Sequence, residues 1–226
     1  MKYGTISIAF LIIMLIGFSC KNRGTNKAIG EGEIHYNIEY AGDVSTGMLP
    51  KTLIISFKQN KAKFEMLSAF GNSGIVNILN PEDEIYDTYF TLLTLKYYYE
   101  GSAEELFPGF DAMEGIEITK TSKVMEICGY NCKNAEVTLP FDRNKIMSVW
   151  YTDEIAAESL YITTPFKEIE GVLLDFFCYI GDTEFRFSAK NVYLKTISDD
   201  TFARRSNYKK ISKEEISSFI YKMVSF

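Results

Sequence analysis

Apolar and polar residues alternate along much of the chain, which is the pattern of a β-strand with one buried face. Between Glu33 and Tyr40 every second residue is Ile or Tyr, and the residues between them are Glu, His or Asn. This period of two predicts an antiparallel strand whose polar face is exposed. Similar runs over 52–58 and 61–69, separated by Gln59 and Asn60, predict a hairpin with Phe57, Phe64 and Met66 in the core.

Further apolar runs bounded by turn residues predict strands over 74–80, 85–100 (two strands, or one long bent strand), 135–139, 146–152, 171–180, 184–189 and 191–197. Two segments instead carry the spacing of a helix capping box, in which Ser precedes Glu by three residues. Ser102 predicts a short helix that ends before Pro108, and Ser212 predicts a helix that begins near the C-terminal end of the sequence. The second helix has an apolar stripe suited to docking on a sheet, and binding a partner is its alternative role.

The composition fits a strand-rich globular protein. Of 226 residues, 46% are hydrophobic and 15% are aromatic, which suits half-buried pleated surfaces. The formal net charge of −6 argues against nucleic-acid binding, because phosphate recognition needs clustered Lys and Arg. One basic cluster (Arg204, Arg205, Lys209, Lys210, Lys213) is either a solvated connector or a contact with anionic lipid head groups.

The first twenty residues have the build of a secretory signal: Lys2, an apolar run over 6–18, and small residues before Cys20. The cut point resembles the lipobox of bacterial lipoproteins, although Gly17 stands where Leu is usual. We therefore expect a signal peptide over 1–20 with lipidation at Cys20, a flexible tether over 21–30 and one domain over 31–226. A plain cleaved signal and an uncleaved anchor are the alternatives.

The remaining cysteines are Cys128, Cys132 and Cys178. In an exported protein a disulfide is permitted; Cys128 with Cys132 is one pairing, and Cys178 is the alternative partner. The spacing lacks the paired Cys-x-x-Cys motifs and His ligands of a zinc site, so we expect no metal and no cofactor. His35 is the single histidine, and no nucleophile stands beside a base, so the sequence offers no catalytic residues.

Aromatic residues gather in the middle of the chain and could form one wall of an apolar groove. Core packing between strands is the alternative for the same side chains. The candidate groove residues are Tyr86, Tyr89, Phe90, Tyr97, Tyr99, Phe107, Phe110 and Trp150. The segment from Ser102 to Met113 is a candidate lid over this groove, although a surface decoration is equally consistent with its sequence.

Five segments in the second half resemble uncharacterised bacterial envelope lipoproteins similar to the LolA/LolB-like lipoprotein-carrier superfamily and, more loosely, to GLPGLI-type proteins. They are 127–135 (ICGYNCKNA), 149–155 (VWYTDEI), 165–166 (PF), 171–174 (GVLL) and 188–192 (SAKNV). The resemblance implies a mainly β (α+β) fold: a strongly curved antiparallel sheet, or incomplete β-barrel, with short helices covering the concave face and a C-terminal helix. It also implies a Gram-negative envelope address, at the outer membrane facing the periplasm.

Together these features predict a membrane-anchored, non-catalytic module that binds a lipid or another apolar ligand. The alternative is a structural or adaptor component of an outer-membrane protein assembly, with an envelope protein as its partner. The resemblance supplies no catalytic residue and does not imply lipoprotein-carrying activity.

Overall fold

The computed structural model describes residues 30–41, 49–68, 71–157 and 159–224, and these form one open sheet with a single α-helix. Cys20 and residues 21–29 lie outside the described residues. The strands are β1 (Glu31–Tyr40), β2 (Thr52–Lys58), β3 (Lys61–Leu67), β4 (Ser73–Asn80), β5 (Ile85–Leu92), β6 (Leu95–Glu100), β7 (Glu117–Ile127), β8 (Tyr130–Thr138), β9 (Ile146–Thr152), β10 (Val172–Ile180), β11 (Thr183–Leu194) and β12 (Lys209–Lys210). The helices are η1 (Pro81–Asp83), η2 (Asp111–Met113), η3 (Asp199–Phe202) and α1 (Lys213–Val224).

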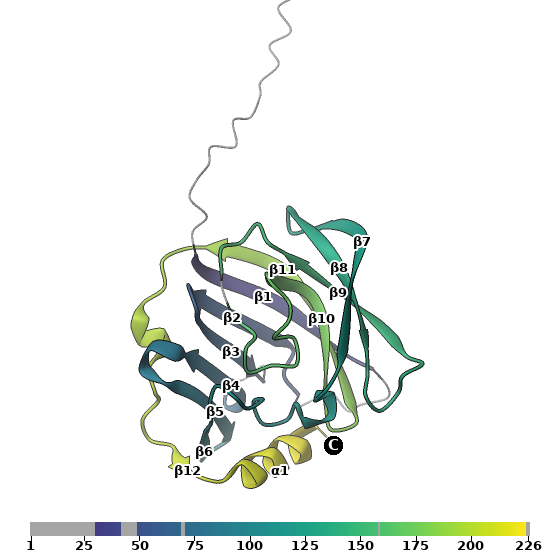
Figure 1. Ribbon diagram of the computed structural model, residues 1–226. Helices are drawn as coiled ribbons and strands as arrows, with labels where there is room; N and C mark the ends of the chain where they lie inside the picture. Colours follow the sequence, from purple (N-terminus) through teal and green to yellow (C-terminus); the bar gives the residue numbers. More distant parts are fainter. Residues whose placement is uncertain (1–29, 42–48, 69–70, 158, 225–226) are drawn as a thin grey trace, which may run out of the picture.

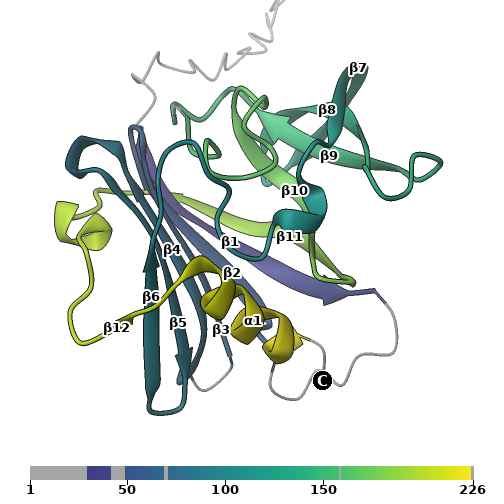
Figure 2. The same cartoon turned by 60° about the horizontal axis from the view of Figure 1, so that its bottom comes forward.

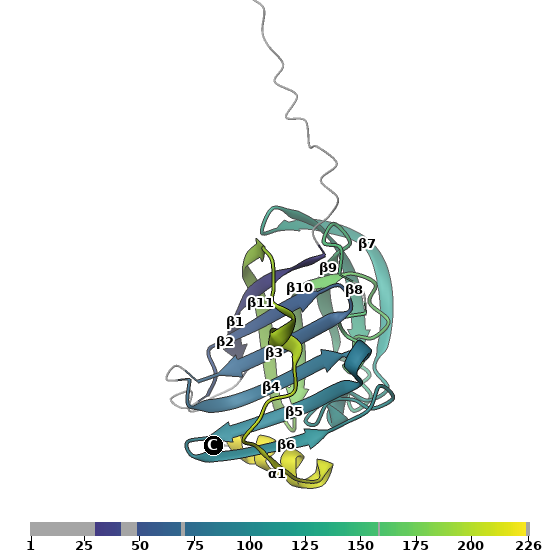
Figure 3. The same cartoon turned by 90° about the vertical axis from the view of Figure 1, so that its left-hand side faces the viewer.

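The sheet consists of two meanders joined along one pair of strands. Its order is β12-β6-β5-β4-β3-β2-β1-β11-β10-β9-β8-β7, so the last long strand returns to pair with the first. All pairs are antiparallel except β12 with β6. The sheet curves strongly, as Figures 1 and 3 show, but its end strands do not meet to close a barrel. The predicted fold class, a curved antiparallel sheet with a C-terminal helix, is confirmed.

The inner, concave face carries the main core, and α1 lies across it (Figure 2). Ser212 caps this helix as predicted: the Glu215 amide donates to Ser212 Oγ (3.2 Å), and the Ser212 amide donates to Glu215 Oε2 (3.0 Å). Ile216 and Ile220 are fully buried, and the Phe219 ring stacks on Tyr97 at 5.1 Å. The apolar stripe of α1 therefore packs on the sheet rather than facing a partner.

The outer face of β3 to β5 is covered by a second layer, residues 195–208, which we call the outer strap (Figure 2). Every residue of β4 is buried, because Ile75 and Leu79 face the main core while Val76 and Ile78 pack with Phe202 of the strap. Strands covered on both faces have continuous apolar runs, as β4 does.

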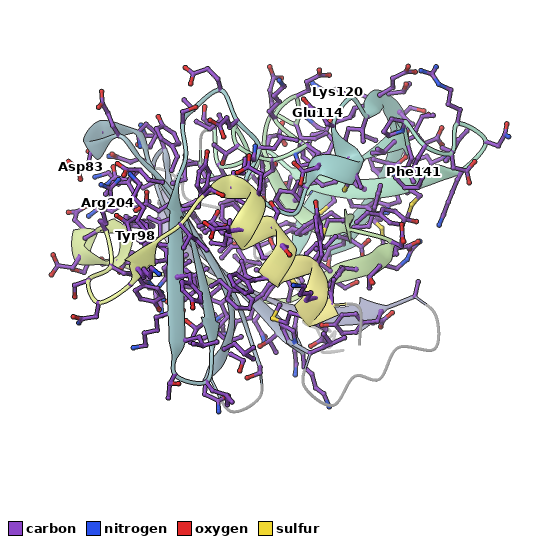
Figure 4. All side chains as sticks on the ribbon, turned by 90° about the horizontal axis from the view of Figure 1, so that it is seen from below. Asp83, Tyr98, Glu114, Lys120, Phe141 and Arg204 are labelled. Atoms are coloured by element: carbon purple, nitrogen blue, oxygen red, sulfur yellow. The ribbon has the colours of Figure 1, made fainter. Side chains whose placement is uncertain are left out.

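The strap is fixed by a buried carboxylate. Asp87 is fully buried and accepts hydrogen bonds from Arg204 Nε (2.8 Å) and Nη2 (3.2 Å) and from the Tyr89 hydroxyl (2.7 Å). Arg205 pairs with Glu65 at 2.8 Å, and Lys210 pairs with Glu100. Most of the basic cluster thus binds the protein's own carboxylates, which favours the connector interpretation. Figure 4 places Arg204 and Tyr98 on this side of the molecule, away from Phe141.

Two local predictions are wrong. Ser102 begins a turn, not a helix, because the Glu105 side chain binds Tyr99 and the Phe107 amide donates to Thr163 O of a distant segment. The strands predicted over 184–189 and 191–197 form one strand, β11, with a bulge at Lys190 where the register with β1 shifts.

Substituting Arg204→Leu should lower the free energy of unfolding by about 2–3 kcal/mol, because Asp87 would remain buried without its cation. The matched control is Arg143→Leu, whose partner Glu117 is 64% exposed and whose loss should change stability by less than about 0.5 kcal/mol. Urea unfolding of both variants measures the difference. Equal losses would contradict the role given to Asp87.

Candidate functional site

A small apolar cavity lies between the inner face of the sheet and two irregular segments, 101–116 and 159–171, which we call the cover. Its volume is about 40 Å³. The sheet supplies Leu53, Phe64, Met66, Ile75, Asn77, Phe176, Cys178 and Phe187, and the cover supplies Phe107, Phe110, Tyr161, Thr164 and Phe166. The two walls come from β2–β4 and from β10–β11, so the cavity exists only where the two meanders face each other.

Aromatic rings meet where the sheet and the cover come into contact. Phe64 meets Phe107 edge to face at 6.3 Å, and Phe166 meets Phe176 edge to face at 6.0 Å. Phe176 in turn stacks on Phe187 at 4.7 Å. Such contacts are large in area but not directional in the way hydrogen bonds are, so rings can separate without leaving polar groups unpaired.

Hydrogen bonds join the two cover segments to each other and to the sheet. The Phe107 amide donates to Thr163 O (2.9 Å), which joins the two cover segments to each other. The Leu173 amide of β10 donates to the Tyr161 hydroxyl (3.0 Å). Burial of the Tyr161 ring raises the pKa of its hydroxyl well above the ordinary value. The tyrosine therefore stays neutral and holds residues 159–171 against the sheet.

Glu105 fastens the other cover segment. Its carboxylate accepts from the Tyr99 hydroxyl of β6 (2.7 Å) and pairs with Lys213 of α1 (3.4 Å). The hydrogen bond from Tyr99, together with Lys213, holds the pKa of Glu105 below its ordinary value of 4.5. Burial and the bond to Glu105 raise the pKa of Tyr99 to about 12. We call this contact the Glu105 latch.

The outside of the cover is polar. A trough of about 430 Å³ runs along it, lined in part by Glu104, Glu114, Glu168 and Lys167, and Thr164 lines both this trough and the apolar cavity. The cover is thus one layer thick, with an apolar inner side and a charged outer side.

The structure separates the residues of the candidate aromatic groove. Phe107 and Phe110 line the cavity. Four others face the same side of the sheet but pack away from the cavity in the main core: Tyr86, Phe90, Tyr97 and Tyr99. Tyr89 lies on the outer face against Tyr208 of the strap, at 4.9 Å. Trp150 of β9 is half-buried and packs at the margin of the main core, and it does not line the cavity.

Most of the sheet residues that line the cavity were not predicted from the sequence. Phe64 and Met66 were expected only as core residues, and Leu53, Ile75, Phe176 and Phe187 were not singled out. Alternation along each strand marks these side chains as inward-facing. It does not tell which inward-facing residues border a void, since that depends on the packing of a cover with no periodic pattern.

The cysteines lie in unequal environments. Cys128 and Gly129 have φ angles of 53° and 81° and form the two-residue turn between β7 and β8, a conformation that favours glycine at the second position. Cys132 and Cys178 are buried, and burial raises the pKa of the Cys132 thiol to about 11. The three are free thiols in this structure, so a Cys128–Cys132 disulfide, or one with Cys178, stays a prediction.

Two other kinds of feature, a metal site and a membrane-spanning helix, are absent from the described ranges. No group of three or more His, Cys, Asp or Glu side chains there is placed to hold a metal ion. In the same part of the chain no helix is both long and apolar enough to cross a membrane. His35 lies on β1, 3.3 Å from Glu33, and is not among the residues lining the cavity.

The architecture is similar to part of a solved protein. PNGF-II, in its P21 crystal form, superposes with a TM-score of 0.54 at 16% identity over 86% of this chain and 34% of that chain. This chain therefore spans 34% of the length of PNGF-II. At 16% identity the likeness shows the fold alone. No protein-family model and no curated protein sequence matches the chain.

Two mycobacterial proteins match more distantly. The lipoprotein LppX of Mycobacterium tuberculosis gives a TM-score of 0.36 at 12% identity over 75% of this chain and 90% of its own. LprF of Mycobacterium bovis gives 0.28 at 9% identity, over 77% of this chain and 90% of its own.

The Glu105 latch should weaken in acid. Because the folded pKa of Glu105 lies below 4.5, its contribution is full above about pH 4.5 and is lost as the pH falls through the folded value. Hydrogen exchange at the Phe107 amide, corrected for intrinsic rates, should therefore speed up below that pH. Glu105→Gln should exchange fast already at pH 7 and respond little to acid.

The matched control is Glu104→Gln, one residue away, which should behave as the unsubstituted protein. Equal protection of the Phe107 amide in the Glu105→Gln variant and the unsubstituted protein would show that the latch does not hold the cover.

Proposed function

We propose that this chain is a lipid-anchored envelope protein whose domain binds an apolar ligand between the sheet and the cover. In this proposal Cys20 carries the lipid, residues 21–30 form the tether and residues 31–226 form a single LolA/LolB-like domain. The domain faces the periplasm from the outer membrane, needs no cofactor and acts by binding rather than by catalysis. The observation that carries the proposal is the apolar cavity under the aromatic cover.

The size of the cavity sets a condition on binding. A volume of about 40 Å³ has room for about three water molecules at 10–15 Å³ each. An acyl chain is far larger, so the cover must move outward for a ligand to enter. The cover has only one regular element, the three-residue η2, and several of its inner contacts are between rings. We expect such a segment to separate from the sheet more readily than a hydrogen-bonded strand does.

The hydrophobic effect is large enough to drive such opening. Each buried methylene contributes about 0.8 kcal/mol, so a ten-carbon chain contributes about 8 kcal/mol. That corresponds to a dissociation constant of about 1 μM before the free energy of opening the cover is subtracted. Opening the cover breaks the Glu105 latch and the aromatic contacts, and the free energy this requires offsets part of the gain from burying the chain. We therefore expect affinities weaker than about 1 μM for a chain of that length.

The adaptor alternative rests on a different surface. β7 is an edge strand of eleven residues whose outer backbone groups pair with no other described strand, and Val124 and Met125 on it are exposed. Exposed edges can accept a strand from a partner. However, Lys120 and Lys123 and the irregular pairing between Lys120 and Val124 are devices that protect an edge from added strands. We therefore place ligand binding first.

Filling the cavity should weaken ligand binding without changing the other face of the sheet. Ile75→Phe adds volume inside the cavity, whereas Ile78→Phe makes the same change three residues along β4 on the outer face. Both overpack the core and should destabilise by about 1–3 kcal/mol. Only Ile75→Phe should weaken binding of the fluorescent apolar probe N-phenyl-1-naphthylamine, by tenfold or more. Equal binding by both variants would exclude this cavity as the site.

Anchoring is tested separately from binding. Cys20→Ser should abolish incorporation of a clickable palmitate analogue and move the protein from the membrane to the soluble envelope fraction, because a single thiol carries the acyl group. Cys128→Ser is the control and should leave labelling and fractionation unchanged. Labelling that persists in Cys20→Ser would show that the lipid is attached elsewhere.

A further inference from the structure

One polar side chain stands in the apolar wall of the cavity. Asn77 lies between Ile75 and Leu79 on the inner face of β4, is only 7% exposed and lines the cavity. Its neighbours across the sheet are Phe64 on β3 and Thr88 on β5. Apart from this amide, the sheet wall of the cavity consists of Leu, Ile, Met and Phe side chains and the thiol of Cys178.

The hydrogen bond of the Asn77 side chain is made by its oxygen. Thr88 Oγ1 donates to Asn77 Oδ1 at 2.8 Å, whereas Nδ2 donates no hydrogen bond to the described residues. Phe64, directly opposite Asn77 on β3, also lines the cavity. Because Asn77 itself lines the cavity, the donor that the bond to Thr88 leaves free borders the space beneath the cover.

Other buried asparagines of the sheet differ in this respect. Asn134 donates through Nδ2 to Val149 O (3.2 Å) and accepts at Oδ1 from Thr121 (2.9 Å). Asn80 donates through Nδ2 to Asp83 (2.7 Å). Neither lines the cavity. Buried polar groups are normally paired, and an N–H that faces a cavity without a partner is the arrangement a ligand acceptor completes.

The surroundings restrict the acceptor to a neutral one. No Lys, Arg or His lines the cavity, so a carboxylate or phosphate there would be buried without a counter-ion. A second polar group of the lining, the Thr164 hydroxyl, already donates to Tyr161 O and accepts from the Phe166 amide. The ligand group must therefore accept a hydrogen bond from Asn77 and carry no net charge. A carbonyl oxygen meets both conditions.

We propose that Asn77 Nδ2 donates a hydrogen bond to a neutral carbonyl oxygen of the ligand. The ligand class is then an apolar molecule with an ester or keto group inside its buried part, rather than a plain hydrocarbon or a free carboxylate. This proposal rests on the proposed function, because it needs the cavity to accept a ligand at all.

The test compares octan-2-one with octane, which differ chiefly in the carbonyl. Affinities of both for the full protein, measured by ligand-observed NMR, give a ketone-to-octane ratio. Asn77→Leu, which keeps the side-chain volume, should lower that ratio by about 3- to 10-fold, the effect of one neutral hydrogen bond. Comparing this ratio between the variant and the unsubstituted protein cancels the difference in the free energy of transfer of the two molecules out of water. Asn134→Leu makes the same change outside the cavity and should leave the ratio unaltered.

A second measurement needs no variant. The infrared stretch of ¹³C-labelled octan-2-one bound to the unsubstituted protein should lie at lower frequency than in octane solution, because a hydrogen bond weakens the carbonyl. An unshifted stretch, or an unchanged ratio in Asn77→Leu, with both molecules still bound, overturns the role of Asn77 and leaves the proposed function standing. Failure of both molecules to bind the unsubstituted protein overturns the two together.

Discussion

The pairing of β1 with β11 is the constraint on which the rest of the structure depends. It joins a meander over residues 31–100 to another over 117–194, from Gly32 opposite Leu194 to Tyr40 opposite Phe185. Gly32 has no alternative here, since a β-carbon would lie 2.4 Å from Tyr193 O. The Tyr36 hydroxyl then reaches past β11 to donate to Leu173 O of β10 at 2.6 Å. The amide of the same Leu173 donates to Tyr161 of the cover. One strand pair therefore positions both cavity walls and the cover.

The two faces of the sheet are closed in physically different ways. On the outer face, the strap is held by a buried carboxylate with charged partners, which resists separation because an unpaired buried charge is very unfavourable. On the inner face, the cover is held by ring contacts, by the partly exposed Glu105 latch and by hydrogen bonds to β10, from the Leu173 amide to Tyr161 and from the Tyr179 amide to Met113 Sδ. The layer behind β4 is therefore fixed by an ion pair to a buried carboxylate, whereas the layer in front of β4 is fixed by apolar contacts and by neutral or partly exposed hydrogen bonds.

Much of the sheet could be predicted from the sequence, because alternation directly reflects a strand with one buried face. The strand at Glu33 to Tyr40 and the capping box at Ser212 are examples, and both are local signals. β7 was not predicted as a strand, since as an exposed edge it alternates little. The turn at Ser102 was mistaken for a helix because the contact that opposes a helix, from the Phe107 amide to Thr163 O, comes from far along the chain. The candidate site was harder still. Tyr89 and Phe90 are adjacent aromatics that pack on opposite faces of the sheet, and an aromatic cluster in the sequence does not reveal that division.

The central claim is that the space between sheet and cover holds an apolar molecule. Native mass spectrometry of the protein released from its own membranes without added detergent tests it most directly. We predict a complex heavier than the lipidated chain by the mass of one apolar molecule. Solvent extraction should release this molecule, and the Ile78→Phe variant should retain it. A spectrum showing only the lipidated chain, together with no uptake of added apolar molecules, would contradict this claim.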